Sequence, residues 1–212
     1  MRLGVMAAAA MLVACVSNSV GTSDAKAGTE EAPALEAGQK EAVFAGGCFW
    51  CMEKPFDVVD GVISTTSGYT AGPEKAPSYD QVSSKQTGHT EAIRVVYDPE
   101  KVTYDRLLEV FWHNIDPTQA NGQFCDRGKQ YRTGVYTNDA GEKAKAEATK
   151  AKVAEELGKP VVTEIEPLGA FWVAEAYHQD FYEKNPMHYT RYRTGCGRDR
   201  RLAELWGEQA GH

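Results

Sequence analysis

Two cysteines, Cys48 and Cys51, stand in the stretch Gly-Gly-Cys-Phe-Trp-Cys at 46–51 and offer the clearest chemistry in the chain. An apolar segment precedes this stretch and helical spacing follows it, so Cys48 is predicted where a strand turns into a helix. Glycines permit a sharp turn, and the free amides at a helix start lower a cysteine pKa. Although a free cysteine is most often simply buried, this position favours a reactive nucleophile.

A carboxyl group is the best candidate partner for that nucleophile. Residues 91–97 alternate like a strand, and Glu91 lies on the same face as Ile93 and Val95. Burial on an apolar face raises a carboxyl pKa, and a neutral acid can donate a hydrogen bond or a proton. The alternative is that Glu91, at the start of its strand, simply reaches solvent.

The chain has five cysteines, an odd number at irregular spacing that does not form a disulfide framework and suits redox or nucleophilic work. Its 212 residues, 42% hydrophobic and 25% charged, are enough for one sizeable core. The net charge of −7 and the lack of a long basic run argue against a nucleic-acid-binding protein.

The first residues, 1–15, have the pattern of an export signal, with Arg2 followed by a continuous apolar or small run. That run is shorter than the about 20 residues that span a bilayer. It ends Leu-Val-Ala-Cys, which resembles the bacterial lipoprotein box, so Cys15 is predicted to carry a lipid anchor. A plain signal peptide and a misassigned start codon are the alternatives.

Composition divides the remainder of the chain. Residues 16–40 are rich in Ala, Glu, Gly, Ser and Thr and have no aromatic residue, which predicts a disordered tether. A catalytic domain is expected over 41–207 and a disordered C-terminus over 208–212.

Periodicity predicts intermixed strands and helices within that domain. Strands are expected at 41–45, 62–70, 91–97, 134–136 and 161–168, and helices at 103–111, 139–157 and 174–184. The helices are too few for a doubly wound sheet, so the expected fold is α+β, a two-layer α/β sandwich with a mixed sheet, a ferredoxin-like core and a long irregular C-terminal tail.

A series of motifs in this order resembles the A-type methionine sulfoxide reductases, the peptide-methionine (S)-S-oxide reductases. The resemblance covers about 43–207 and is specific when the motifs are taken together. They are Gly46-Gly47-Cys48-Phe49-Trp50, Ser67-Gly68-Tyr69-Thr70-Ala71-Gly72, Gly88-His89-Thr90-Glu91-Ala92, Tyr97-Asp98-Pro99, Asp116-Pro117-Thr118-Gln119, Asp126-Arg127-Gly128-Lys129-Gln130-Tyr131-Arg132 and Lys184-Asn185-Pro186.

The resemblance implies a reaction in which Cys48 attacks the sulfur of methionine S-sulfoxide, free or in proteins. Phe49 and Trp50 would form the apolar pocket for the substrate's methyl group. Cys48 would become a sulfenic acid that condenses with a thiol to a disulfide. An external thioredoxin-like dithiol would reduce that disulfide by exchange, with no bound cofactor and no metal.

The resemblance also implies how the sulfoxide oxygen is held. Glu91, Tyr79 and Tyr131 would hydrogen-bond it, Glu91 would supply the proton, and Asp126 would support the network. From the residues alone, the two tyrosines could equally be ordinary half-buried side chains, and Asp126 a turn former. His178 is expected to have a structural role, because no residue that would orient its ring can be identified from the sequence.

The resolving thiol is where this chain departs from the most familiar family pattern, which has two cysteines in a glycine-rich tail. Here the tail holds only Cys196, between two glycines and predicted to be mobile enough to reach Cys48. Cys51, one helical turn away, is ranked second. Cys125, at a position where the family more often carries asparagine, is ranked third.

Two other classes of protein remain as alternatives. The Cys48-x-x-Cys51 spacing suits a thiol–disulfide oxidoreductase, although such a pair alone is a weak signal. A four-thiolate zinc site is less favoured, because a second closely spaced cysteine pair is missing. The preferred prediction is a monomeric, exported reductase on the periplasmic side, held to a membrane only by its lipid anchor.

Overall fold

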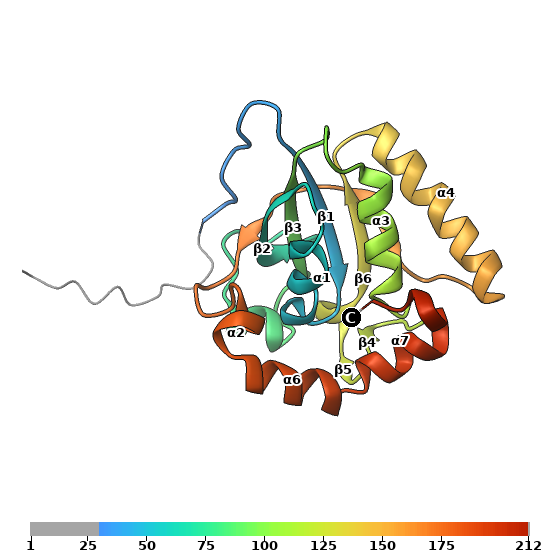
Figure 1. The fold of residues 1–212 in the computed structure, drawn as a ribbon. Helices are drawn as coiled ribbons and strands as arrows, with labels where there is room; N and C mark the ends of the chain where they lie inside the picture. Colours follow the sequence, from blue (N-terminus) through green and yellow to red (C-terminus); the bar gives the residue numbers. More distant parts are fainter. Residues whose placement is uncertain (1–29, 212) are drawn as a thin grey trace, which may run out of the picture.

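The computed structural model describes residues 30–211. A six-stranded sheet with the strand order β7-β6-β1-β3-β2-β8 forms its centre (Figure 1). Neighbouring strands are antiparallel except for the parallel pair β6–β7, so the predicted mixed sheet is confirmed. The strands are β1 (Lys40–Gly46), β2 (Val62–Thr70), β3 (Thr90–Tyr97), β6 (Thr133–Thr137), β7 (Glu164–Pro167) and β8 (Trp172–Val173), with β4 (Gly122–Gln123) and β5 (Asp126–Arg127) as a separate pair.

Helices and segments without regular structure cover the two faces of the sheet. The α-helices are α1 (Glu53–Asp57), α2 (Tyr79–Ser83), α3 (Tyr104–His113), α4 (Ala140–Leu157), α5 (Phe181–Lys184), α6 (Pro186–Gly195) and α7 (Arg198–Trp206), with the short 3-10 helices η1 (Phe49–Cys51), η2 (Lys129–Tyr131) and η3 (Gly207–Gln209). None of the helices within 30–211 is both long and apolar enough to cross a membrane.

The main core lies between the sheet and α3. Thr103 caps α3, accepting from the backbone N–H of Arg106 at 3.2 Å, as the sequence predicts. Leu107 and Phe111 are fully buried, and the Phe111 ring stacks on Phe44 of β1 with centroids 5.0 Å apart. This packing holds β1, and therefore the residues that follow it, on a fixed base.

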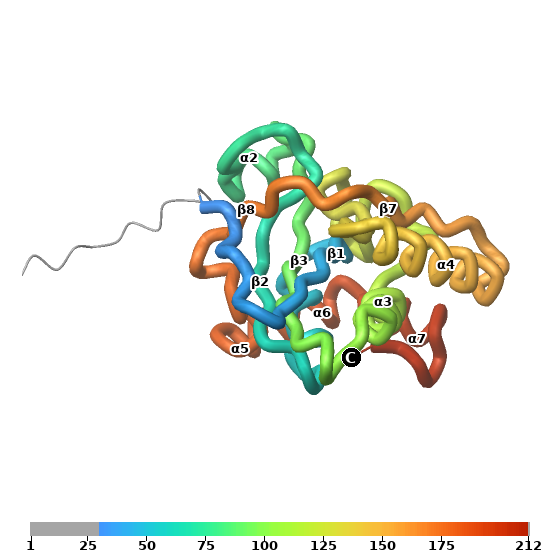
Figure 2. The backbone as a smooth tube through the Cα atoms, turned by 90° about the horizontal axis from the view of Figure 1, so that it is seen from above, coloured from blue at the N-terminus to red at the C-terminus, as the bar shows by residue number. Residues whose placement is uncertain are grey.

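The opposite face of the sheet has a smaller cluster that includes Val43, Tyr136 and Phe171. The chain between β7 and β8 crosses this face, as its orange trace shows in Figure 2. Before β1, Ala32 donates its backbone N–H to Phe171 at 3.0 Å. Residues 30–32 of the predicted tether are therefore paired with β8 and Phe171 at the edge of the sheet rather than free of it.

The C-terminal region differs from the expected irregular tail, because it forms α6 and α7 below the sheet (Figure 1). Pro186 occupies the first turn of α6, and Gly197 separates the two helices with φ +71°. Leu202 and Trp206, four residues apart, bury the apolar face of α7. Residues 208–211, predicted to be disordered, continue from α7, and Gly211 donates its backbone N–H to the His113 carbonyl at 2.8 Å.

The predicted helix over 174–184 is also shorter than expected, since only α5 at its end is helical. Gln179 explains the difference: its side chain accepts from Ser67 N–H and donates to the Ser67 carbonyl, both at 2.9 Å. Because of these bonds, residues 174–180 lie against β2 and form a series of turns instead of a helix. That segment consequently reaches the residues around Cys48.

Candidate active site

Cys48 lies between β1 and η1, which confirms the predicted strand-to-helix turn. Gly47 adopts φ +85°, a backbone conformation that residues other than glycine rarely adopt. A Cβ atom at Gly47 would also lie 2.6 Å from the Cβ atom of Gln123. Arg198 of α7 donates to the Gly46 carbonyl at 2.9 Å, so a side chain from the C-terminal helix helps to hold this turn in place.

The Cys48 thiol is only 7% exposed, and burial raises its pKa well above the ordinary value. The prediction of a thiolate stabilised by a helix start is therefore wrong for the free site. The reason is that η1 has only three residues, so it has no long dipole to offset desolvation. A hydrogen bond between the two thiols lowers the pKa of Cys51 to about 7, helped by the charge of Arg198.

Glu91 on β3 is 1% exposed, so it does not reach solvent. Its Oε2 accepts from the backbone N–H of Phe49 at 3.1 Å, directly after Cys48. Burial raises its pKa to about 8, which outweighs that hydrogen bond. The structure thus agrees with the expected burial of Glu91 and the expected rise in its pKa, while its role as the acid stays a prediction.

Two half-buried tyrosines complete this side of the site. Tyr79 begins α2 and Tyr131 ends η2. Burial is the main cause of the raised pKa of both phenols, and the charges of Glu91 and Cys48 add to it. The structure therefore brings together four residues that are distant in the sequence.

Asp126 of β5 stands at the edge of the same group. Its Oδ2 accepts from the Tyr192 hydroxyl at 2.6 Å, and burial raises its pKa. Tyr192 in turn packs edge-on against the Trp50 ring, with centroids 5.9 Å apart. Asp126 thus connects α6 to the aromatic side chains beside Cys48.

Phe49 and Trp50 bring aromatic rings to the site, and their predicted role as the pocket for the substrate's methyl group stays a prediction. The Phe49 side chain is 1% exposed, and Trp50 stacks on Phe181 with centroids 3.7 Å apart. His178 lies against both rings, at centroid distances of 4.9 Å from Phe49 and 5.7 Å from Trp50. An apolar group of substrate next to Cys48 would contact these aromatic faces.

His178 and Glu175 are site residues that the sequence reasoning missed. The Nδ1 of His178 accepts from the Trp50 indole N–H at 3.0 Å, and burial lowers the His178 pKa to about 4, so the ring is neutral. Glu175 accepts from the Tyr79 backbone N–H at 2.8 Å and from the Tyr69 hydroxyl at 2.7 Å. The sequence analysis took His178 as structural, because its hydrogen bond to Trp50, 128 positions away, arises only in the folded chain.

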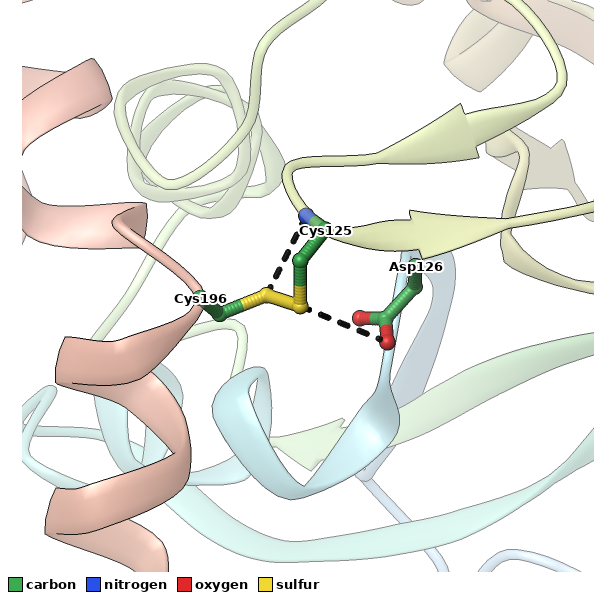
Figure 3. A group of neighbouring side chains, drawn as sticks. All are labelled: Cys125, Asp126 and Cys196. Atoms are coloured by element: carbon green, nitrogen blue, oxygen red, sulfur yellow. Dashed lines mark hydrogen bonds between the residues drawn. A yellow bond between two sulfur atoms is a disulfide. The ribbon is translucent and has the colours of Figure 1, made fainter.

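The four cysteines of the described residues form two pairs. Cys125 and Cys196 are joined in a disulfide beside Asp126 (Figure 3), whereas Cys48 and Cys51 are free and buried. The predicted role of Cys196 as first resolving thiol stays a prediction, because in this state its sulfur is bound to Cys125. The same disulfide argues against the four-thiolate zinc alternative, because it occupies the sulfurs of two of the four proposed ligands.

Comparisons with known proteins agree with this site. The family model described as peptide methionine sulfoxide reductase matches residues 40–210. The peptide methionine sulfoxide reductase MsrA of Bacillus subtilis is 49% identical over 168 residues, covering 78% of this chain and 95% of that protein. MsrA 2 of Rhizobium meliloti is 46% identical over 178 residues, covering 84% and 89% respectively.

Solved structures show the same relationship. Mxr1 from Saccharomyces cerevisiae in reduced form superposes with a TM-score of 0.69 at 30% identity, covering 73% of this chain and 90% of that one. Methionine sulfoxide reductase A of Corynebacterium diphtheriae gives a TM-score of 0.66 at 34% identity, covering 72% and 77%. By its matched length, its identity to these proteins and its fold, the chain belongs to the peptide methionine sulfoxide reductase family.

Proposed function

We propose that this protein reduces the S epimer of methionine sulfoxide, free and within proteins, to methionine. The observation that carries the proposal is the buried Glu91, which accepts from the backbone N–H of Phe49 directly after Cys48 and whose pKa burial raises to about 8. A sulfoxide oxygen is a poor leaving group until it is protonated, so the reaction needs an acid beside the attacking sulfur.

In the first step Cys48 Sγ attacks the sulfoxide sulfur while Glu91 protonates the sulfoxide oxygen. The oxygen ends on Cys48 as a sulfenic acid, and the methionine thioether leaves. Cys48 and Glu91 both hold their protons at neutral pH, because burial raises both pKa values. The proton released from Cys48 can therefore replace the one that Glu91 donates.

The S epimer is selected by the difference between the two sides of the site. With the oxygen toward Glu91, Tyr79 and Tyr131, the methyl group lies on the Trp50 ring. The R epimer would exchange these two groups and leave its oxygen without a hydrogen-bond donor against an aromatic surface. An unsatisfied buried polar group costs about 1–3 kcal/mol, enough to discriminate strongly between epimers.

The sulfenic acid then condenses with a thiol of the same chain to form a disulfide and water. Cys51, a free and buried thiol that interacts with Cys48, is the candidate that this structure favours, although the sequence ranked Cys196 first. A thioredoxin-like dithiol outside the protein returns the disulfide to thiols by exchange. The cycle needs no bound cofactor.

Single-turnover assays of the reduced, full-length protein against the separate S and R epimers test this proposal. Release of methionine from the S epimer alone, abolished in Cys48→Ser and retained in Cys51→Ser, is expected. Retention is expected because Cys51 acts only after methionine has left. Methionine release by Cys48→Ser, or none by the wild type, would leave the dithiol-oxidoreductase alternative, for which insulin disulfide reduction is the direct assay.

We infer from the sequence that the protein is exported, monomeric and anchored by lipid on Cys15, which lies outside the described residues. The support is the apolar run at 1–15 that ends in Leu-Val-Ala-Cys. Labelling with radioactive palmitate should mark the wild type and not Cys15→Ala. A variant that stays labelled would refute the anchor. An exported enzyme would take electrons from a thioredoxin-like donor in an oxidising compartment.

A further inference from the structure

Arg198 is a buried cation that has no counter-ion in the described part of the chain. Three arginines there are buried, and two of them are paired: Arg94 with Glu41, and Arg193 with Asp199 at 2.6 Å. Arg198, at 1% exposure the most buried of the three, forms no ion pair with a described carboxylate. Charged side chains are almost never fully buried unless they are paired, because desolvation of a lone charge is costly.

The hydrogen bonds of Arg198 do not compensate its charge. Its Nη2 donates to the carbonyl oxygens of Gly46 and Asn114, each at 2.9 Å, and lies 3.0 Å from Met52 Sδ, so all three partners are uncharged. Its Nε is buried without a hydrogen-bond partner. A neutral amide donor would be sufficient to bind the two carbonyls, so holding the turn does not require a full positive charge.

Cys51 is the group near Arg198 whose ionisation would supply an anion. It is 1% exposed and directly precedes Met52, whose sulfur Arg198 contacts. The hydrogen bond from Cys48 is the largest cause that lowers the pKa of Cys51 to about 7; burial opposes it, and the charge of Arg198 lowers the pKa further. A positive charge beside a cysteine favours the thiolate, which is the nucleophilic form.

Two charged groups besides Arg198 act on Cys51. Arg193 favours its thiolate, but that guanidinium is already paired with Asp199, and the charge of Asp126 opposes the thiolate. The remaining titratable groups near Cys51 hold their protons at neutral pH, because burial raises their pKa values. They are Cys48, Glu91, Tyr189 and Tyr192. Arg198 is therefore the described cation that acts on Cys51 without an ion-pair partner of its own.

We propose that Arg198 is the counter-charge of the Cys51 thiolate and thereby prepares Cys51 to attack the Cys48 sulfenic acid. This inference rests on the proposed function, in which that sulfenic acid forms. It makes Arg198 a positioning residue of the second chemical step, in addition to its contact with the Gly46 carbonyl.

The step balances as a displacement at Cys48 Sγ. The Cys51 thiolate attacks this sulfur, the S–S bond forms, and the S–O bond of the sulfenic acid breaks. The departing hydroxide takes the proton that Glu91 has regained from Cys48 and leaves as water. Cys48 is reduced from sulfenic acid to disulfide, and Cys51 is oxidised from thiolate to disulfide. Arg198 then faces a neutral disulfide, so its charge also favours the later return of Cys51 to a thiolate.

Titration of the thiolate by ultraviolet absorbance tests this charge without a reagent that must reach a buried sulfur. The full-length protein is used with the Cys125–Cys196 disulfide intact and with Cys48 and Cys51 free, as in the structure. The wild type minus Cys51→Ser should show one ionisation near pH 7. Arg198→Met, measured against the same variant with Cys51→Ser, should raise the midpoint by at least about one pH unit.

Three further variants control for effects other than charge. Arg198→Lys keeps the charge and should keep the midpoint close to that of the wild type. Arg198→Gln keeps a donor for the carbonyls without the charge, and it replaces Arg198→Met if that variant does not fold. Arg193→Met should raise the midpoint less, because its guanidinium is paired with Asp199. An unchanged midpoint in the neutral Arg198 variants, or an equal rise in Arg198→Lys, would overturn the proposal.

Single-turnover kinetics separate this role from support of the turn. With the Cys125–Cys196 disulfide intact, one equivalent of methionine S-sulfoxide is added; methionine release reports the first step, and mass spectrometry of acid-quenched samples reports loss of the sulfenic acid. In Arg198→Met the sulfenic acid should persist about 10-fold longer near pH 6.5, with a smaller change in methionine release. The delay should shrink as pH rises to about 9, where Cys51 ionises without help. A delay that is independent of pH would show that Arg198 acts only through its hydrogen bonds.

The failure of this inference differs from the failure of the proposed function. Methionine release by the wild type, together with an unchanged Cys51 midpoint in Arg198→Met, overturns the counter-charge and leaves the reductase activity standing. No methionine release by the wild type overturns the proposed function, while the absorbance titration still shows whether Arg198 ionises Cys51.

Discussion

Burial at Glu91 and Cys48 determines which groups hold protons in the free site. Both side chains are almost inaccessible, and desolvation disfavours the charged form of each. Glu91 and Cys48 are therefore both protonated before substrate binds, whereas the pKa of Cys51 is lowered to about 7. A sulfoxide oxygen entering this site meets a donor rather than a carboxylate.

Glu91→Gln keeps a hydrogen-bond donor but removes the proton that can be transferred. We expect kcat/KM for methionine S-sulfoxide to fall by roughly 10²- to 10⁴-fold. In the wild type, kcat/KM should decline as pH rises through about 8, because Glu91 then loses its proton. That decline should be absent from the residual activity of Glu91→Gln; identical pH profiles would show that Glu91 is not the acid.

The same carboxyl group should make the protein less stable at alkaline pH. Its pKa is raised on folding, so the folded state binds a proton that the unfolded state releases, and stability falls as pH rises from about 4.5 to about 8. Glu91→Gln should therefore unfold like the wild type near pH 4 but be more stable near pH 9 by roughly a few kcal/mol. Urea unfolding at both pH values measures this; an equal stability difference at both would contradict it.

His178 positions the Trp50 indole through a single hydrogen bond of 3.0 Å. Because His178 does not reach Cys48, we expect His178→Ala to raise KM by about 10-fold, roughly the loss of one hydrogen bond, with a smaller change in kcat. His178→Asn places an oxygen acceptor near the Nδ1 position and should restore most of the KM. Steady-state kinetics of the two variants would contradict the positioning role if both behaved alike.

At the scale of elements, the turn between β1 and η1 is held by two neighbouring elements, β4 and α7. Gly47 needs φ +85° and contacts Gln123, which itself donates to the Asp116 carbonyl at 2.7 Å. Arg198, 1% exposed, donates to the Gly46 and Asn114 carbonyls at 2.9 Å each. The position of Cys48 is thus set by β4 and α7 as much as by its own segment.

Gly47→Ala should disrupt that turn, since its Cβ atom would meet Gln123 at 2.6 Å in a disfavoured backbone conformation. We expect a loss of at least about 2 kcal/mol in the free energy of unfolding, together with most of the activity. Gly195→Ala in α6 is the matched control, because nothing lies within 4 Å of its Cβ position. Chemical denaturation that ranked the two variants equally would contradict this account.

At the scale of the whole molecule, the Cys125–Cys196 disulfide joins the active-site loop to the C-terminal helices across 71 positions of sequence. Closing so long a loop restricts the unfolded chain, so the bond stabilises the fold as well as standing at the surface of the site.

Replacing both cysteines, Cys125→Ser with Cys196→Ser, should lower the free energy of unfolding by about 2–4 kcal/mol under non-reducing conditions. The difference from the wild type should largely disappear when excess reductant is present, which is the internal control. Thermal or urea unfolding in both conditions measures it. Equal stability without reductant would mean that the bond does not constrain the unfolded chain.

Local sequence determined the parts of this protein that depend on neighbours along the chain. The Gly-Gly-Cys turn, the alternation that buries Glu91 and the cap of α3 at Thr103 each arise within a few residues, where periodicity and backbone preference are decisive. The family motifs, taken together, also indicated the chemistry, because each motif is a short run of neighbouring residues that can be recognised in the sequence.

Tertiary structure decided what depends on contacts between distant residues. The pairing of Cys125 with Cys196, the bond from His178 to Trp50 and the bond from Arg198 to Gly46 join residues 71 to 152 positions apart. The raised pKa of Cys48 follows from burial in the same packing. The C-terminal tail folded into helices because Leu202 and Trp206 found a core to bury against. Sequence spacing cannot show these partners, since burial and the local dielectric exist only once the sheet and its helices have assembled.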